Sequence, residues 1–128
     1  MRAQVVGYWI CTILIAFSFL SGGVVDLIRP SFALEGMAHL GYPAYFMLIL
    51  GFWKVLGGGA ILLPGFPLLK EWAYAGMIFD LTGASASHLA SGDALFHIVT
   101  PLILAALVVA SWALRPEASG GFAPRAAN

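Results

Sequence analysis

The sequence predicts an all-α integral membrane protein, and two observations support this fold class: the composition and the length of the apolar segments. Of its 128 residues, 61% are hydrophobic and only 9% are charged. Soluble domains have roughly 45–50% apolar and about 25% charged residues. A soluble fold of this length could not bury so much apolar surface, because small domains expose a large fraction of their area. We therefore predict a multi-pass protein that is surrounded by lipid.

Four apolar segments are each long enough to cross a bilayer, which takes about 20 helical residues. We predict that they form a four-helix transmembrane bundle over residues 1–115. The remaining residues, 116–128, are rich in Gly, Ala and Pro and are predicted to be disordered. The four segments are residues 4–25, 43–63, 71–90 and 95–114.

The first segment has a longer apolar body than the 7–15 residues of a typical signal-peptide core, so we expect it to be retained. The second ends at Pro64-Gly65-Phe66-Pro67, a strong turn signal. Ser91-Gly92-Asp93-Ala94 forms a tight reversal between the third and fourth. Pro101 lies inside the fourth segment, where neighbouring helices can satisfy the carbonyl that it leaves free. Most tryptophans and tyrosines, Tyr74 among them, are assigned to aromatic belts at the two membrane interfaces, whereas Trp53 is expected to lie deeper and to pack against lipid or a neighbouring helix.

The distribution of Lys and Arg predicts the orientation of the segments. Short loops rich in these residues stay in the cytoplasm. Only Arg29 lies on one side, whereas the other side carries Arg2, Lys70, Arg115 and Arg125. We therefore predict that both termini are cytoplasmic and that the loop at residues 26–42 and the reversal near Asp93 face outward.

Two charged residues interrupt the middle of the apolar segments. Lys54 lies 12 residues before Phe66 and Asp80 lies 14 residues after it, so an antiparallel hairpin brings them to similar depth. An isolated charge at the bilayer centre costs about 2.5–3.5 kcal/mol or more. We predict a Lys54–Asp80 ion pair inside the bundle. This pair either sets the register of two helices or forms a site for a proton, an ion or a quinone headgroup.

Small residues accompany these charges at helical spacing. Such residues let membrane helices approach closely, and polar residues hydrogen-bond across the interface. We predict that segments 43–63 and 71–90 pack closely through two matching faces. The faces consist of Gly51, Lys54, Gly57 and Gly58, and of Gly76, Asp80, Gly83, Ala84, Ser87 and His88.

A second polar group is predicted at the outer ends of the segments. His88 and His97 lie symmetrically about the reversal, and Glu35 and His39 lie on the same side. Histidines near carboxylates suit proton relay, quinone binding or metal and haem ligation, and they also occur as interfacial residues hydrogen-bonded to neighbours or water. Two histidines on a hairpin are not a complete ligand set, so no metal site is predicted. The ligand or proton-relay candidates are His88, His97, Asp93 and Asp26.

Several short strings resemble one family. They are His39-Leu40-Gly41-Tyr42-Pro43 before a helix with Gly51 and Lys54, the stretch Lys-Glu-Trp-Ala-Tyr-Ala-Gly at 70–76, Phe-Asp-Leu-Thr-Gly-Ala at 79–84, Ser87-His88 and Gly92-Asp93. The chain resembles the DoxX-like family of small bacterial four-helix membrane proteins, which takes its name from a subunit of an archaeal thiosulfate:quinone oxidoreductase. The resemblance implies the bacterial cytoplasmic (inner) membrane and a quinone-linked redox role. The positions that match the family pattern are Lys54, Asp80, His88 and Asp93.

Three functions fit these observations. The first is a quinone-linked subunit of a membrane oxidoreductase system, in which quinone is the cofactor and a redox partner protein supplies electrons. The second is a structural or assembly module without its own chemistry. The third is a transporter of protons or a small solute, which would require a homo-oligomer. Enzymatic activity and catalytic residues are left open, and the formal net charge of zero gives no basic patch for nucleic acid.

Overall fold

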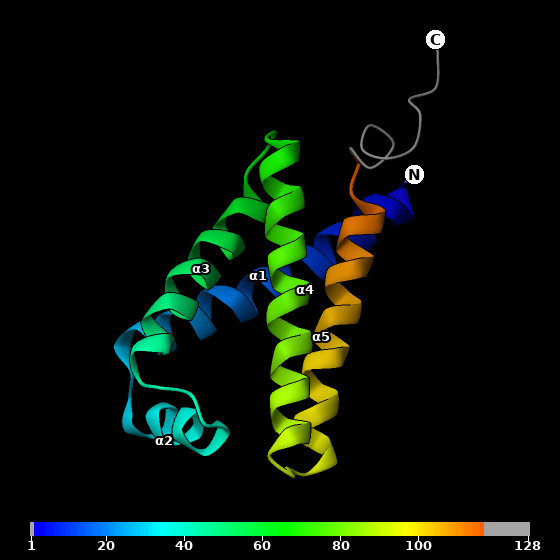
Figure 1. The fold of residues 1–128 in the computed structure, drawn as a ribbon. Helices are drawn as coiled ribbons and strands as arrows, with labels where there is room; N and C mark the ends of the chain where they lie inside the picture. The colour runs from blue at the N-terminus through cyan, green and yellow to red at the C-terminus, as the bar shows by residue number, and fades with distance from the viewer. Residues whose placement is uncertain (1, 117–128) are drawn as a thin grey trace.

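The computed structural model describes residues 2–116 and contains five α-helices and no strand within that range (Figure 1). The all-α prediction is confirmed to this extent. The tail that the sequence predicts to be disordered lies outside the described residues, apart from Pro116. The helices are α1 (Arg2–Ile28), α2 (Ser31–Leu40), α3 (Tyr45–Leu62), α4 (Pro67–Ala90) and α5 (Leu95–Leu114).

Three of these helices are long and apolar enough to cross a membrane: Ala3–Ile28, Tyr45–Leu62 and Leu95–Leu114. The fourth predicted span corresponds to α4, which has 24 residues but is the least apolar of the long helices. Its lower apolarity follows from its charged residues and from many small and polar side chains. Pro101 lies inside α5, and the helix continues past it.

Helix α2 replaces most of the predicted outer loop. The first helix continues through Asp26, so this residue is helical rather than part of a loop. Pro30 separates α1 from α2, because it lacks the N–H that a continuing helix would need. At the other end of α2, Gly41 has a left-handed backbone (φ 89°) and its N–H bonds to the carbonyl of Ala38, which ends the helix.

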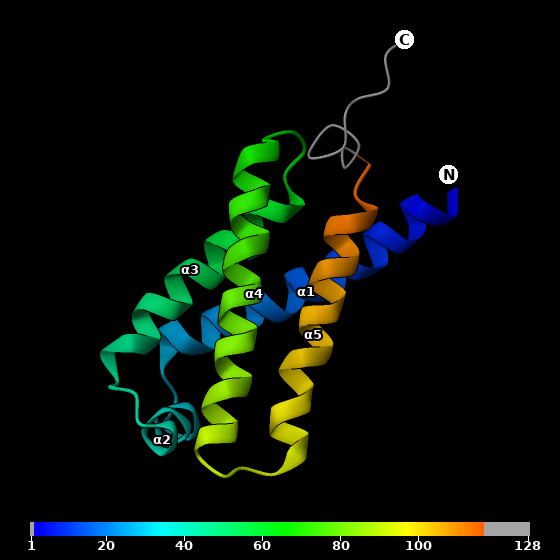
Figure 2. The same ribbon diagram turned by 45° about the vertical axis from the view of Figure 1, so that its right-hand side comes forward.

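The helices pack unevenly around one core. Helix α1 packs against α3 and α5, and α4 packs against α5, whereas α3 and α4 make the fewest contacts of the packed pairs. In both ribbon views α3 and α4 lie close together at their connecting turn and diverge toward α2 (Figures 1 and 2). The core contains Ile15, Phe19, Ile61, Met77, Leu81 and Val108.

Close packing through glycine occurs between α1 and α3, not between α3 and α4 as predicted. A Cβ added to Gly51 would lie 2.8 Å from the carbonyl oxygen of Gly23, and one added to Gly58 would lie 2.9 Å from Cγ of Leu20. By contrast, a Cβ built at Gly76 or Gly83 would meet no atom within 4 Å apart from its chain neighbours and the adjacent backbone of α4. The prediction chose the wrong partner because helical spacing identifies a face of small residues but not the helix that covers it.

A buried hydroxyl network joins α1, α4 and α5. Ser111 Oγ lies 2.6 Å from Thr12 Oγ1 and 2.8 Å from the hydroxyl of Tyr74. All three residues are buried, so the prediction of an interfacial Tyr74 is wrong. Buried hydroxyls need partners, and this network satisfies them inside the protein.

Candidate functional site

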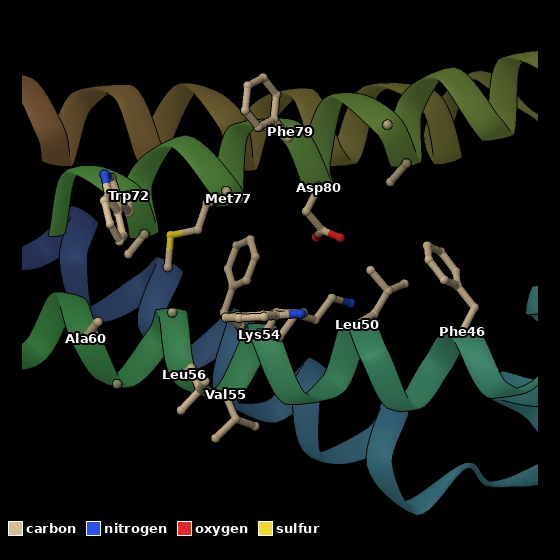
Figure 3. Close-up of a pocket in the computed structure, with 18 of the residues that line it drawn as sticks. Phe46, Leu50, Lys54, Val55, Leu56, Ala60, Trp72, Met77, Phe79 and Asp80 are labelled. Carbon is tan, nitrogen blue, oxygen red and sulfur yellow. The ribbon is translucent and has the colours of Figure 1, made fainter. Parts of the chain in front are cut away.

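A large cleft separates α3 from α4. Its volume is about 980 Å³, and its walls are mainly apolar (Figure 3). Met37 and Leu40 of α2 and Phe19 of α1 also contribute to the lining. We call this space the α3–α4 cleft. Its aromatic lining residues are Phe19, Tyr42, Phe46, Trp53, Trp72 and Phe79.

The predicted ion pair of Lys54 has a different partner. Lys54 Nζ lies 3.0 Å from Asp26 Oδ2, and no ion pair joins Lys54 to Asp80 within residues 2–116. The reason is the close contact between Gly23 of α1 and Gly51 of α3. Asp26 and Lys54 each lie about one helical turn after the contacting glycine of their own helix, so this contact brings them together. The equal depth of Lys54 and Asp80 is therefore not enough for contact, because α3 and α4 diverge.

Asp80 nevertheless faces the same charges across the cleft. Its carboxylate points from α4 toward α3 and the Lys54 side chain (Figure 3), and both residues line the α3–α4 cleft. It interacts electrostatically with Lys54 and with Asp26 without contacting them. The side chains of Lys54 and Asp26 are 23% and 15% exposed, so the pair is largely covered by protein, and Lys54 is the member that lines the cleft.

The second polar group assembles around Asp93 in the α4–α5 loop. Its two oxygens lie 2.6 Å from His39 Nε2 and 2.6 Å from His88 Nδ1. Hydrogen bonds from His88 and His39 hold the pKa of the Asp93 carboxyl below its ordinary value of 3.8. The ring of His97 stacks on that of His88, with centroids 5.4 Å apart. Asp26 does not belong to this group, since it lies against Lys54.

One hydrogen bond connects α2 to the wall of the cleft. The hydroxyl of Tyr42 lies 2.5 Å from Ser87 Oγ, and both residues line the α3–α4 cleft. Ser87 also donates to the carbonyl of Gly83, one turn earlier in α4. Together with the His39–Asp93 contact, this bond attaches α2 to the α4–α5 hairpin. Sequence reasoning did not predict a role for Tyr42, although its position directly after the helix-ending Gly41 was a usable signal.

Comparison with known proteins identifies the family. Residues 10–111 match the DoxX-like family. The chain belongs to the DoxX-like family. The matched range includes the whole cleft lining together with Lys54, Asp80, His88 and Asp93. No curated protein and no solved structure matches the chain.

At the opposite end of this DoxX-like chain, an ion pair joins α4 to α5. Arg115 Nη2 contacts Glu71, and Arg115 Nη1 donates to the carbonyl of Trp112 over 2.6 Å. The indole N–H of Trp112 donates to Glu71 Oε1 over 3.1 Å. Sequence reasoning did not predict this group. The sequence nevertheless contained a signal for this group, because Glu71 and Arg115 lie at the same end of two antiparallel segments.

The site of this DoxX-like chain presents Lys54 and Asp80 to a bound molecule. Within residues 2–116, no three His, Cys, Asp or Glu side chains are arranged to hold a metal ion. Cys11 is the only cysteine in the sequence, so the chain has no dithiol. The α3–α4 cleft combines apolar, aromatic walls with Lys54 and Asp80. Such a cleft suits an apolar molecule with a polar headgroup.

Proposed function

We propose that this DoxX-like chain is a four-span protein of the bacterial cytoplasmic membrane that binds a quinone in the α3–α4 cleft. In this proposal it is a quinone-binding subunit of a membrane oxidoreductase system. The observation that carries the proposal is an apolar, aromatic-lined cleft of about 980 Å³ with Lys54 and Asp80 in its wall. This volume lies at the upper end of the roughly 300–1,000 Å³ of typical ligand pockets.

The proposed fourth span is α4, and the contacts of its ionisable residues support this placement. Glu71 is paired with Arg115, His88 is bonded to Asp93, and Asp80 faces the cleft rather than lipid. Ionisable residues in membrane helices usually face the protein interior and pair with one another.

Both termini are proposed to lie on the cytoplasmic side. The beginning of α1 and the end of α5 lie together, since Gln4 donates to the carbonyl of Leu114 over 3.1 Å. Arg115 lies at the same end of the molecule, and cytoplasmic ends are rich in Lys and Arg.

A quinone matches the chemistry of the cleft. Its oxygens are neutral hydrogen-bond acceptors, which Lys54 can reach as a donor, and its ring can stack on aromatic residues of the lining. Its isoprenoid tail would lie along the apolar walls between α3 and α4. One cysteine cannot form an internal dithiol, and the proposal includes a redox partner protein that supplies the electrons.

The test starts from the protein purified from its own membrane in mild detergent. Native mass spectrometry and solvent extraction then identify bound molecules. We expect stoichiometric quinone. A sample that carries only phospholipid, without a copurifying redox protein, would contradict the proposal and favour the assembly-module alternative.

A titration tests the site itself. Trp53 and Trp72 line the cleft, so adding a short-tailed ubiquinone analogue should quench their fluorescence. Asp80→Ala should weaken binding by about 10-fold, which corresponds to the loss of one hydrogen bond to a polar ligand group, ~1.4 kcal/mol. Alanine is chosen because asparagine would keep a hydrogen-bond donor at this position. The matched control is Thr82→Ala on the same helix, because Thr82 is exposed and donates only to carbonyls of α4. Equal affinities of the two variants would contradict the proposal that the quinone headgroup binds at Asp80.

A further inference from the structure

Three ionisable side chains from three helices lie near one another. Lys54 of α3 and Asp80 of α4 line the cleft, and Asp26 of α1 contacts Lys54 without lining the cleft itself. Lys54 Nζ lies 3.0 Å from Asp26 Oδ2. Asp80 interacts electrostatically with both residues without contacting either. Asp26 Oδ2 is fully buried and makes no hydrogen bond within residues 2–116, so its interaction with Lys54 is an ion pair alone. Two carboxyl groups therefore share a single ammonium group.

No second cation on the packed helices balances the extra carboxylate. Lys54 is the only charged residue of α3, and α5 contains no Asp, Glu, Lys or Arg. The only Lys or Arg of α4 is Lys70, which lies two to three helical turns before Asp80. Apart from Asp26, the only charged residue of α1 is Arg2, at the beginning of that helix. Of the remaining titratable groups, Tyr42 lines the cleft but is bonded to Ser87. Arg29, directly after α1, and Glu35 and His39 of α2 are exposed. The fully ionised group would thus hold one net negative charge among apolar walls.

A net charge in such surroundings is unfavourable, and the group can remove it by binding one proton. The geometry selects the carboxyl that carries it. Asp26 lies 3.0 Å from the ammonium group of Lys54, whereas Asp80 has no contacting cation. We propose that Asp26, Lys54 and Asp80 form a proton-binding site that holds one exchangeable proton on Asp80 at neutral pH.

This site would also define the ligand class of the cleft, an extension that rests on the proposed function. Because Asp26 neutralises Lys54, the cleft offers no net positive charge to an anion. A protonated Asp80 instead donates a hydrogen bond, which suits a neutral carbonyl oxygen such as that of a quinone. Carboxylates and phosphates would be poor ligands by the same argument.

The test is infrared spectroscopy of the full chain in detergent or lipid, in H₂O and D₂O. A protonated carboxyl has its own C=O stretching band, which shifts on deuteration and can be counted per chain. At neutral pH we expect one such band in the wild type and none in Asp80→Asn. We also expect none in Asp26→Asn, because the freed Lys54 then neutralises Asp80. Lys54→Met should give two, because both carboxyls lose their cation.

Two controls keep this series interpretable. Glu35→Gln removes an exposed carboxyl of α2 and should leave the band unchanged. Circular dichroism and gel filtration check each variant for folding, and if Lys54→Met does not fold, the two Asp→Asn variants are sufficient. Absence of the band in the folded wild type, or its survival in Asp80→Asn, would overturn the proton-binding site.

Adding the ubiquinone analogue separates this inference from the proposed function. A shift of the Asp80 band on saturation supports the ligand class. Tryptophan quenching without any band shift would overturn the hydrogen bond from Asp80 to the ligand. A band that is present and lost in Asp80→Asn, in a protein that binds no quinone, would support the proton-binding site while contradicting the proposed function.

Discussion

The two faces of α3 differ in how closely they approach their neighbours. On one face, Gly51 and Gly58 bring α3 so close to α1 that an added Cβ would lie 2.8–2.9 Å from atoms of α1. On the other face, α3 diverges from α4, and the α3–α4 cleft fills the space between them. Similar small residues thus close one interface and leave the other open. Composition alone does not distinguish a glycine that permits contact from one that preserves a cavity.

This difference explains the arrangement of the charges. The closed face forms the Asp26–Lys54 ion pair, and the open face leaves Asp80 across the cleft. If α3 packed on α4 as closely as on α1, Lys54 could contact Asp80 and no ligand space would remain. The contrast therefore predicts that adding a methyl group should matter greatly on one face and little on the other.

The largest effect is expected on the closed face. Gly51→Ala places Cβ against the backbone carbonyl of Gly23, which cannot move without separating α1 from α3. Overpacking of this kind costs about 1–3 kcal/mol. Thermal unfolding in detergent measures it. The matched control is Gly83→Ala on the open face, which should leave stability unchanged or raise it by up to about 1 kcal/mol, since Ala favours helix over Gly. Equal losses of stability in both variants would contradict the proposed difference between the two faces of α3.

A bulkier residue on the open face should affect binding rather than stability. Gly83→Leu extends a side chain into the α3–α4 cleft, and its Cβ would meet no atom within 4 Å apart from its chain neighbours and the adjacent backbone of α4. We expect binding of the ubiquinone analogue to weaken by about 10-fold, or ~1.4 kcal/mol. Ala86→Leu is the control, because Ala86 is exposed on α4 and does not line the cleft. Unchanged affinity in Gly83→Leu would place the ligand elsewhere.

A smaller effect is expected at the hydrogen bond that attaches α2. Tyr42→Phe removes the hydroxyl that lies 2.5 Å from Ser87 Oγ. Loss of a typical hydrogen bond costs about 0.5–1.5 kcal/mol, and Ser87 keeps its bond to Gly83. Hydrogen exchange of the α2 backbone should quicken relative to that of α3. Replacement of exposed Tyr45 by Phe is the control. Equal exchange of α2 in both variants would mean that this bond does not hold the helix.

The smallest effect is expected when the pH is lowered and Asp93 becomes protonated. Because the pKa of Asp93 is lowered in the folded protein, its hydrogen bonds stabilise the fold above pH 3.8, the ordinary value, and this contribution is lost as the pH falls through the lower, folded pKa. Hydrogen-exchange protection factors of α2 should therefore decline only below about pH 4 for this contact. In Asp93→Asn the decline should be absent. A wild-type curve identical to that of the variant would show that Asp93 does not attach α2.

Much of the fold could be predicted from local sequence. The apolar segments, the turn at Pro64-Gly65-Phe66-Pro67 and the reversal at 91–94 all correspond to helix boundaries in the structure. Helix α2 was missed because a ten-residue helix is only marginally stable in isolation. Pro30 precedes it, Gly41 ends it, and His39 bonds to Asp93. The bond to Asp93 is a tertiary contact that leaves little trace in the sequence of the helix.

The candidate site was predicted in its parts but not in its pairing. The depth of Lys54 and Asp80 follows from counting residues along helices of fixed rise, and the proximity of His88 and His97 follows from their spacing about a tight reversal. Both are local quantities, so the amino-acid order determines them. The partner of Lys54 and the existence of the cleft depend on which helices touch. Only the tertiary structure decides this, because the distance between two helices reflects the steric fit of Gly23 against Gly51 rather than any property of α3 alone.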